Sequence, residues 1–520
     1  MTIARLGLGL REVAPRSANL TPDDAGRRAP TLQQDMRPAM SSDPLSSLRR
    51  RHFLHASAAC VVTGFAALAS AAVGSAAAGS GARVRTLLAG PARVRMVGEA
   101  APTTEVWAYN GVEPGPVLRL RQGRQFQATV ENRLDEDTTV HWHGIRLPNA
   151  MDGVPGLTQR PIPPGGRYGY AFTPPDAGTF WYHSHDNGLE QMGRGLVGAL
   201  IVDEVEPPRV DRDLLWAIGD WRLRSDSQIA PGFDNRMEAM MNGRVGNTVT
   251  INGRVPNAVP VRAGERVRVR LLNTAIARIM ALSFEGHRPM VVALDGQPCD
   301  PHEPAGGRIV LGPAMRADVM LDMQGEPGHS YRVVDDFYDR LAYTLVDLAY
   351  DASPPLRAHP LDGDLRLPAN PVPRPDLTHA VVQEIRMQGG MMGAGGMGGM
   401  MGGMMGGGGA EWAINGQSMT GDGNANMPPL FTIDRGRSCI LEFNNATAWW
   451  HPMHLHGHSF HVLSRDGVLV PHDEWGDTVL VRPREQVRVA FVADNPGNWM
   501  LHCHVMEHQV GGLMTVFRVT

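Results

Sequence analysis

Short runs of alternating apolar and polar residues fill most of the chain, and Gly, Pro and Asn separate one run from the next. A period of two residues is that of a β-strand with one buried face, and the 3.6-residue period of an amphipathic helix is almost absent. With 520 residues, the chain is too long for one ordinary hydrophobic core. The pattern therefore predicts an all-β protein of about three sandwich or barrel domains.

One strand pattern occurs three times. Each copy has a glycine, alternating apolar positions and an asparagine nine residues after the glycine: RQGRQFQATVEN (121–132), RAGERVRVRLLN (262–273) and DRGRSCILEFNN (434–445). A second likeness links only the first and third copies, AGTFWYHSH (177–185) with PGNWMLHCH (496–504) and HWHG (141–144) with HLHG (454–457). We predict domains at 83–205, 206–375 and 376–520, the middle one a spacer.

Histidines recur in the pattern His-x-His far more often than chance allows. Twenty histidines in 520 residues give about one such pair by chance, yet the chain has five. On a strand, the two imidazoles of a pair project from the same face about 6.6 Å apart, which suits two metal ions of a cluster. If the end domains pack together, eight imidazoles converge: His141, His143, His183, His185, His454, His456, His502 and His504.

Cys503 lies between two of these histidines, and alternation therefore turns its side chain to the opposite face of the strand. There it can meet His508, beyond a turn, and His451, which precedes PMHLHG. A trigonal site of two histidines and one cysteine is the blue-copper arrangement for one-electron transfer. One tripeptide thus joins two predicted metal sites.

The motifs HWHG, WYHSH, HPMHLHGH and HCHVMEH, in this order, resemble those of the multicopper oxidases, a family that includes laccases and bacterial cuprous oxidases. The resemblance covers roughly residues 83–520 and implies three cupredoxin-like Greek-key β-barrel or sandwich domains with four copper ions. Substrate electrons would enter at the type 1 copper and pass from Cys503 through His502 and His504 to a cluster that reduces O2 to water. The implied ligands are His451, Cys503 and His508 for type 1; His141 and His454 for type 2; His143, His183 and His504 for one type 3 copper; and His185, His456 and His502 for the other.

Two further residues follow from the same resemblance. The axial neighbour of the type 1 copper lies ten residues after the cysteine, which gives Leu513, whereas the adjacent Met514 should face the other side of the strand. Loss of a thioether at this position should raise the copper potential. Asp152 matches a family acid that relays protons to O2, although it can equally be a turn aspartate before glycine. Glu507 and Glu190 are weaker candidates, and Gln509 replaces an acid of several relatives.

The N-terminal segment 1–78 is predicted to be an export signal. Arg50-Arg51-x-Phe53-Leu54 resembles a twin-arginine motif and precedes an Ala- and Gly-rich stretch that is too weakly apolar for a good membrane anchor. Without this segment, which has nine arginines and five acidic residues, the net charge is −8 instead of −4. We expect a periplasmic monomer exported by the twin-arginine machinery, with no stable membrane span and no nucleic-acid partner.

Residues 387–409 contain eight methionines and thirteen glycines. Such a segment is a flexible linker by composition, but thioethers also select Cu(I), and relatives that oxidise Cu(I) have a methionine-rich insertion in a similar place. The segment therefore favours a role in copper capture.

Three functions remain open at this point. The first is a cuprous or laccase-like oxidase for copper tolerance, which takes electrons from Cu(I) and passes them to O2. The second is oxidation of phenols, Mn(II) or Fe(II), and the third is a copper-sequestering or scaffold protein without catalysis. The sequence also leaves open whether Cys299 and Cys439 form a disulfide.

Overall fold

The computed structural model describes residues 84–391, 411–420 and 428–520, all within one compact unit, Ala78–Thr520. The expected export signal and most of the expected methionine-rich insertion lie outside the described residues. Among the described residues, no helix is long and apolar enough to cross a membrane.

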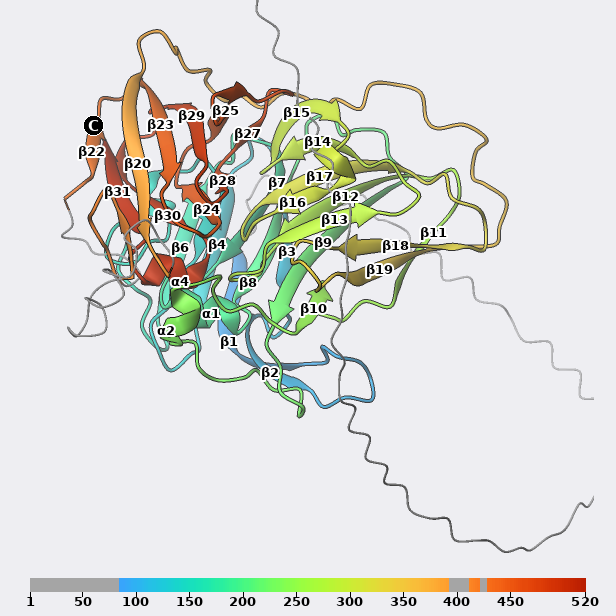
Figure 1. Cartoon of the computed structure of the whole chain (residues 1–520). Coiled ribbons are helices and arrows are strands. Elements are labelled where there is room, and N and C mark those ends of the chain that lie inside the picture. Colours follow the sequence, from blue (N-terminus) through green and yellow to red (C-terminus); the bar gives the residue numbers. More distant parts are fainter. Residues whose placement is uncertain (1–83, 392–410, 421–427) are drawn as a thin grey trace, which may run out of the picture. The chain divides into compact units, whose positions relative to one another are not determined.

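Residues 85–203 form two four-stranded sheets, in agreement with the predicted all-β class (Figure 1). The first sheet has the order β2-β1-β4-β6, with β1 at Arg85–Val94, β2 at Thr104–Tyr109, β4 at Phe126–Asn132 and β6 at Arg167–Phe172. The second has the order β3-β8-β7-β5, with β3 at Gly115–Arg121, β5 at His141–His143, β7 at Gly178–His183 and β8 at Val197–Asp203.

Residues 212–350 also form two sheets. The first has the order β10-β9-β12-β17-β14-β15, with β9 at Arg212–Trp221, β10 at Thr248–Ile251, β12 at Arg266–Asn273, β14 at Met290–Leu294, β15 at Gln297–His302 and β17 at Arg316–Asp322. The second has the order β11-β19-β18-β13-β16, with β11 at Ala258–Val261, β13 at Met280–Phe284, β16 at Ile309–Leu311, β18 at Ser330–Asp335 and β19 at Tyr343–Tyr350.

Residues 381–519 supply the third pair. One sheet has the order β21-β20-β23-β29-β25-β26, with β27 on β25; the bounds are β20 Val381–Gly389, β21 Trp412–Ile414, β23 Ser438–Asn445, β25 Phe460–Arg465, β26 Val468–Leu469, β27 Trp475–Gly476 and β29 Gln486–Val492. The other has the order β22-β31-β30-β24-β28, with β22 at Phe431–Ile433, β24 at His451–Leu455, β28 at Thr478–Val481, β30 at Gly497–Cys503 and β31 at Met514–Val519.

The described helices are short. They are the α-helices α1 (Gly188–Gly193), α2 (Arg236–Ala239) and α4 (Met506–Val510) and the 3-10 helices η1 (Asn149–Met151) and η2 (Ala305–Gly307). Both α1 and α2 contact α4, and these three helices lie close together at the lower left of Figure 1.

The three repeats of the sequence occupy equivalent places in the three sheet pairs. Strands β4, β12 and β23 each lie between a parallel neighbour (β1, β9 and β20) and an antiparallel one (β6, β17 and β29). The asparagine that ends each repeat is buried, and its side-chain amide donates to a backbone carbonyl of the loop that follows: Glu136, Arg278 and Trp449. The repeated asparagine therefore serves to tie loops to a strand end, because buried backbone carbonyls need donors.

The first and third sheet pairs share a hydrophobic core, whereas most of the middle pair has a core of its own. Asn149 Nδ2 donates to the carbonyl of Asn498 at 2.7 Å, and Asn495 Nδ2 donates to that of Leu147 at 2.8 Å, which fastens the first and third domains together. The His-x-His faces of the two end domains are thus held against each other.

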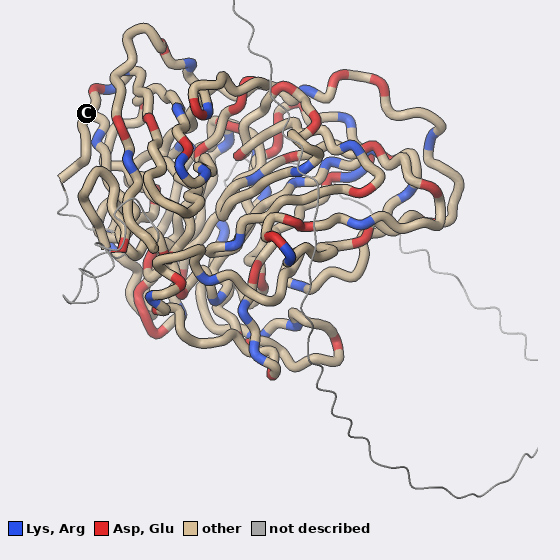
Figure 2. Tube along the Cα trace, in the orientation of Figure 1, with Lys and Arg blue, Asp and Glu red and all other residues tan. Residues whose placement is uncertain are grey.

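Acidic and basic residues are interleaved along the described chain (Figure 2).

Candidate metal centres

The four strands that carry histidines are buried except at Gly497 and Asn498, which begin β30, and β5 forms the edge of its sheet. β5 pairs antiparallel with β7, so that His141 lies opposite His183, and β24 pairs with β30, so that His454 lies opposite His502. Opposed residues of an antiparallel pair project from the same face. Each end domain therefore presents its imidazoles on one face, as the alternation predicts.

The structure brings all eight predicted pocket histidines together, and we call this set the histidine pocket. The His143 and His454 rings stack with centroids 3.7 Å apart, and those of His141 and His456 stack at 4.1 Å. Ring centroids of His185 and His502 lie 5.4 Å apart, and those of His183 and His504 lie 5.2 Å apart. Every one of these pairs joins the first domain to the third.

Ring nitrogens without a protein partner face this pocket. They are His141 Nε2, His143 Nδ1, His183 Nε2, His454 Nε2 and both ring nitrogens of His185 and His504. Buried polar atoms without partners are rare in native proteins, and a set of unpaired imidazole nitrogens is the donor set of a transition metal such as copper. The residues present therefore fit metal ions in this pocket.

The donor distances support some of the implied ligand groups directly. The ring nitrogens of His185, His456 and His502 lie within 4.8 Å of one another. The rings of His143, His183 and His504 are mutual neighbours with centroids 5.1 to 5.7 Å apart, and those of His141 and His454 are 5.7 Å apart. Other combinations, such as His141 with His454 and His456, are equally close, so the assignment of each histidine to one ion stays a prediction.

Asp152 lies at the edge of the histidine pocket and is almost fully buried. Its Oδ2 accepts from His456 Nδ1 at 2.9 Å, and its backbone carbonyl accepts from His141 Nδ1 at 2.7 Å. Burial by itself would raise the pKa of Asp152, but the two histidines hold it well below its usual range. Asp152 is therefore more than a turn aspartate, because it orients two imidazoles of the pocket.

A second carboxylate, Asp477, was not foreseen from the sequence. Its Oδ1 accepts from His143 Nε2 at 2.9 Å, and its carbonyl accepts from His454 Nδ1 at 2.9 Å. Burial would raise the pKa of Asp477, but the charge and hydrogen bonds of Arg316 keep it below its ordinary value. No sequence signal marks it, since Asp477 belongs to no histidine motif.

Away from this pocket, His451, Cys503 and His508 form a three-donor site, fully buried in the third domain. The two Nδ1 atoms lie 3.1 Å apart, and each lies 3.6 Å from Cys503 Sγ. His508 Nε2 lies 2.7 Å from the carbonyl of Met241. Because a carbonyl can only accept, Nε2 carries the proton, and Nδ1 of His508 keeps its lone pair toward the sulfur. Burial raises the pKa of the Cys503 thiol, so a metal ion is needed to stabilise its thiolate.

Strand alternation separates Leu513 from Met514 as predicted from the sequence. Met514 lies opposite His502 in the β30–β31 pair and packs with Met419 and Met500, whereas Leu513 belongs to the same hydrophobic cluster as Cys503. The Cys503 amide also donates to the Leu513 carbonyl at 3.0 Å. An axial place for Leu513 at the three-donor site stays a prediction.

The aromatic ring of Trp412 covers the three-donor site. Its centroid lies 4.3 Å from that of His508 and 5.1 Å from that of His451, and its Nε1 donates to the carbonyl of Ala239 in α2 at 2.7 Å. Met241, whose carbonyl holds His508, is 36% exposed. His508 is therefore one hydrogen bond away from a residue that is partly exposed.

The remaining candidates lie outside both sites. Glu507 Oε1 accepts from the Arg244 amide at 2.6 Å, and burial raises the pKa of Glu507 to about 7. Glu190 forms an ion pair with Arg194 at 2.7 Å, and the amide of Gln509 is buried. Cys299 and Cys439 are free thiols in different hydrophobic clusters.

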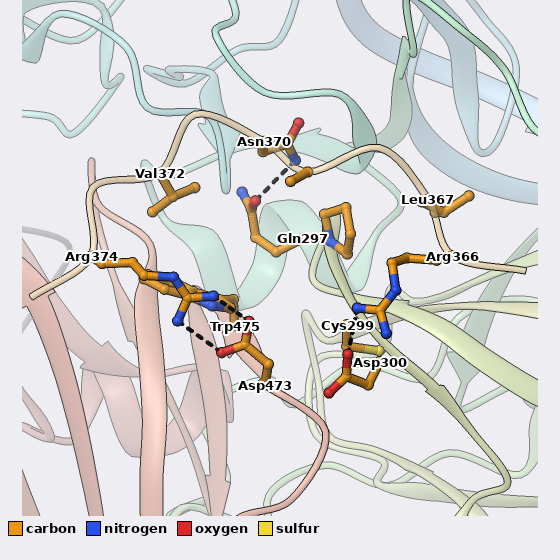
Figure 3. A pocket seen from close by; sticks show the side chains of 12 residues that line it. Gln297, Cys299, Asp300, Arg366, Leu367, Asn370, Val372, Arg374, Asp473 and Trp475 are labelled. Atoms are coloured by element: carbon orange, nitrogen blue, oxygen red, sulfur yellow. Dashed lines mark hydrogen bonds and ion pairs between the residues drawn. The ribbon is translucent and has the colours of Figure 1, made fainter. Parts of the chain in front are cut away.

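A separate cavity of about 230 Å³ lies beside β15 and β27 (Figure 3). Two ion pairs, Arg366 with Asp300 and Arg374 with Asp473, lie on its walls, and the Gln297 amide contacts Asn370. None of the predicted metal ligands lines this cavity.

A site of two histidines and a cysteine beside a pocket of eight histidines has the donor chemistry of a copper oxidoreductase. Three family models, each described as multicopper oxidase, match residues 93–207, 212–346 and 403–520. The chain belongs to the multicopper oxidase family, whose members are copper-binding oxidoreductases.

Individual relatives agree with this assignment. Multicopper oxidase MmcO of Mycobacterium tuberculosis is 32% identical over 468 residues, which cover 83% of this chain and 86% of the relative. Copper resistance protein A of Escherichia coli is 34% identical over 302 residues, or 48% of this chain and 49% of that protein. The crystal structure of a multi-copper oxidase from Pseudomonas thermotolerans is 35% identical, with a TM-score of 0.75, and covers 85% of this chain and 100% of that one.

Proposed function

We propose that this multicopper oxidase holds four copper ions and couples the oxidation of four Cu(I) ions to the reduction of one O2, with four protons, to two water molecules. One ion would lie at the three-donor site and three in the histidine pocket. Copper, when bound, supplies the one-electron chemistry of both sites. The observation that carries the proposal is the position of Cys503, which faces one donor set while its neighbours His502 and His504 face the other.

The protein's own residues have three tasks in this reaction. His508 and Cys503 would bind the copper ion of the three-donor site, and Trp412 covers this site and excludes water from it. The backbone from Cys503 to His502 and His504 is the covalent route between the sites. Asp152, hydrogen-bonded to His456 at the edge of the pocket, is placed to pass protons on for water formation.

The surroundings of the three-donor site favour Cu(I) as the substrate. Met391, the last described residue in the first part of the methionine-rich insertion, donates its amide to the Met240 carbonyl at 2.9 Å, and its own carbonyl accepts from Trp449 Nε1 at 2.9 Å. After the insertion, Glu411 and Trp412 both donate backbone N–H groups to the Gly511 carbonyl. Both flanks of the insertion are therefore tied to the residues around His451 and His508, and thioethers select Cu(I).

Met387 is excluded from the capture role. It lies in β20, is fully buried in the shared core and pairs with Ile414 and Asn445. A test of copper capture can therefore be confined to residues 392–410, because changes there leave the sequence of β20 intact.

The test compares two variants with the wild type. One lacks residues 392–410, and the other keeps the length but changes every methionine in it to leucine: Met392, Met397, Met400, Met401, Met404 and Met405. Both should oxidise Cu(I) more slowly and should oxidise a small phenolic dye at least as fast as the wild type, since only Cu(I) binds thioethers. Unchanged Cu(I) rates in both would contradict the capture of copper by this segment. Parallel rates with Mn(II) and Fe(II) decide whether another metal ion is preferred.

A role in copper tolerance outside the cytoplasm is part of the same proposal. The named function of copper resistance protein A and the twin-arginine pattern at Arg50 and Arg51 support it. Replacement of both arginines by lysine should leave the protein in the cytoplasm, as cell fractionation would detect. Export unaffected by this change would contradict a twin-arginine route.

A further inference from the structure

Arg316 connects the middle domain to both end domains, although the middle domain supplies none of the predicted metal ligands. It begins β17 and is completely buried. Its Nε donates to the carbonyl of Thr179 in the first domain at 3.1 Å, and its NH2 donates to the carbonyl of Asp295 in the middle domain at 2.8 Å. The same guanidinium reaches Asp477 in the third domain.

The contact between Arg316 and Asp477 is a two-pronged ion pair. NH1 donates to Oδ1 at 2.9 Å and NH2 donates to Oδ2 at 2.6 Å. Such a two-pronged contact fixes the plane of the carboxylate and also stabilises its negative charge. A lysine ammonium can stabilise the charge but cannot fix the plane. Oδ1 is also the atom that meets His143 Nε2. Arg316 thus sets the position of the oxygen that orients His143.

This orientation decides which nitrogen of His143 faces the pocket. A carboxylate can only accept, so His143 Nε2 must carry the proton and Nδ1 keeps its lone pair. Nδ1 is buried without a protein partner, beside the other unpaired nitrogens of the pocket. His454 is oriented from the same residue, because its Nδ1–H donates to the Asp477 carbonyl and leaves Nε2 free.

The middle domain also holds the backbone at Asp477. Asp295 Oδ2 accepts from the amides of Asp477 at 3.2 Å and Thr478 at 2.9 Å. Gly144, which follows His143, completes the fit: a Cβ there would lie 2.5 Å from Arg316 NH2 and 2.5 Å from Asp477 Oδ2. Glycine is therefore required where the first domain packs against this ion pair.

We infer that the middle domain is more than a spacer, and that Arg316 is a positioning residue that presents His143 and His454 to the metal ions of the histidine pocket through Asp477. The inference rests on the proposed function in that the pocket must bind copper. Loss of such an orienting partner typically weakens metal binding by about 10- to 100-fold.

The test is copper loading of Arg316→Met and Arg316→Lys, with Arg268→Met as the matched control. Arg268 is an equally buried arginine of the middle domain, paired with Asp318 and Glu204. The three-donor site is an internal reference, because its blue thiolate absorption reports a folded third domain. The measurements are copper per chain, the blue absorption, and the EPR spectrum and binding isotherm of the remaining copper.

We expect Arg316→Met to keep the blue absorption but to bind pocket copper about 10- to 100-fold more weakly, with an altered EPR spectrum. Arg316→Lys keeps the positive charge but cannot make the two-pronged contact. It should therefore bind pocket copper more tightly than Arg316→Met but more weakly than the wild type. Arg268→Met should lose stability but keep pocket copper. Normal pocket copper in both Arg316 variants would overturn the inference, as would equal loss in Arg268→Met or loss of the blue copper along with the rest. If Arg316→Met does not fold, Arg316→Lys against the same control decides. A wild-type pocket without copper would instead contradict the proposed function.

Discussion

The three-donor site and the histidine pocket are equally buried but balance charge in different ways. The imidazoles of the three-donor site contact neutral partners, Thr447 Oγ1 at 2.8 Å from His451 Nε2 and the Met241 carbonyl at 2.7 Å from His508 Nε2. Four imidazoles of the pocket lie next to two carboxylates, His141 and His456 next to Asp152 and His143 and His454 next to Asp477. The difference follows from the ligands. A metal-bound thiolate would supply negative charge at the first site, whereas neutral imidazoles would leave the charge of the proposed pocket metal ions to be offset by the residues that contact them.

The same contrast is visible in the acids. Asp152 and Asp477 have lowered pKa values because cationic or hydrogen-bonding partners outweigh their burial. Glu507, next to His508, lacks a cation at hydrogen-bonding distance among the described residues, and burial raises its pKa to about 7. The two carboxylates that contact pocket imidazoles, Asp152 and Asp477, are therefore ionised, and Glu507 beside the three-donor site becomes neutral below about pH 7.

The largest expected effect comes from Cys503→Ser. Serine cannot supply a thiolate, so the blue absorption should vanish and Cu(I) oxidation should stop, while the histidine pocket keeps its copper. Copper analysis and EPR would measure both sites in one sample. Loss of the pocket copper as well would show that the two sites are not separable.

The next effect concerns acid stability of the copper-free protein. Burial lowers the pKa of nine site imidazoles, seven of them in the pocket: His143, His183, His185, His451, His454, His456, His502, His504 and His508. Below about pH 6.5 these imidazoles bind protons in the unfolded chain but stay neutral in the folded chain. The free energy of unfolding therefore falls by up to about 1.4 kcal/mol per imidazole and pH unit. Since native stability is about 5–15 kcal/mol, unfolding should occur within about two pH units below 6.5.

Copper should suppress this transition because it occupies the nitrogens that protons would take. Circular dichroism during acid titration would follow it. Copper-loaded Cys503→Ser, filled only in the pocket, should keep most of the protection, and a copper-free protein stable at pH 4 would contradict the explanation.

A smaller effect is expected from Asp152→Asn. Asparagine keeps the size of the side chain but not its negative charge, and it cannot pass a proton on, so O2 consumption should slow by about 10²-fold. The blue copper should still be reduced at the wild-type rate, because Asp152 does not touch the three-donor site. Stopped-flow reduction and oxygen uptake separate the two steps. O2 consumption at the wild-type rate would mean that Asp152 only orients imidazoles and does not pass protons.

The smallest effect is expected from Leu513→Met. A thioether beside the three-donor site should lower its potential without changing the pocket, as a redox titration of the blue absorption would show. Met514→Leu is the matched control and should leave the potential unchanged, since Met514 lies opposite His502. The reverse result would mean that Met514 is the axial neighbour.

The sequence predicted those parts of the sites that depend on local spacing. Alternation on β24 and β30 and the turn into α4 determine which way His502, Cys503 and His508 project, so the two donor sets could be separated without a structure. Asp477 and Arg316 could not be found in this way. They meet His143 only because three domains pack together, and neither belongs to a motif.

The arginines of β12 show the same limit. In RVRVRLLN the alternation alone does not reveal that Arg268 and Arg270 are buried. They are buried because the first domain packs on this strand, where Thr179 Oγ1 accepts from Arg270 NH1 at 3.0 Å. A polar strand face faces solvent only when no second domain covers it.

The central claim is that Cys503 and its two neighbours serve separate copper sites. The most direct measurement is a crystal structure of the copper-loaded protein with anomalous scattering at the copper edge. We expect one copper bonded to Cys503 Sγ between His451 and His508, and a separate group of copper ions among the eight imidazoles of the pocket. No copper on Cys503, or copper at only one of the two places, would contradict the account.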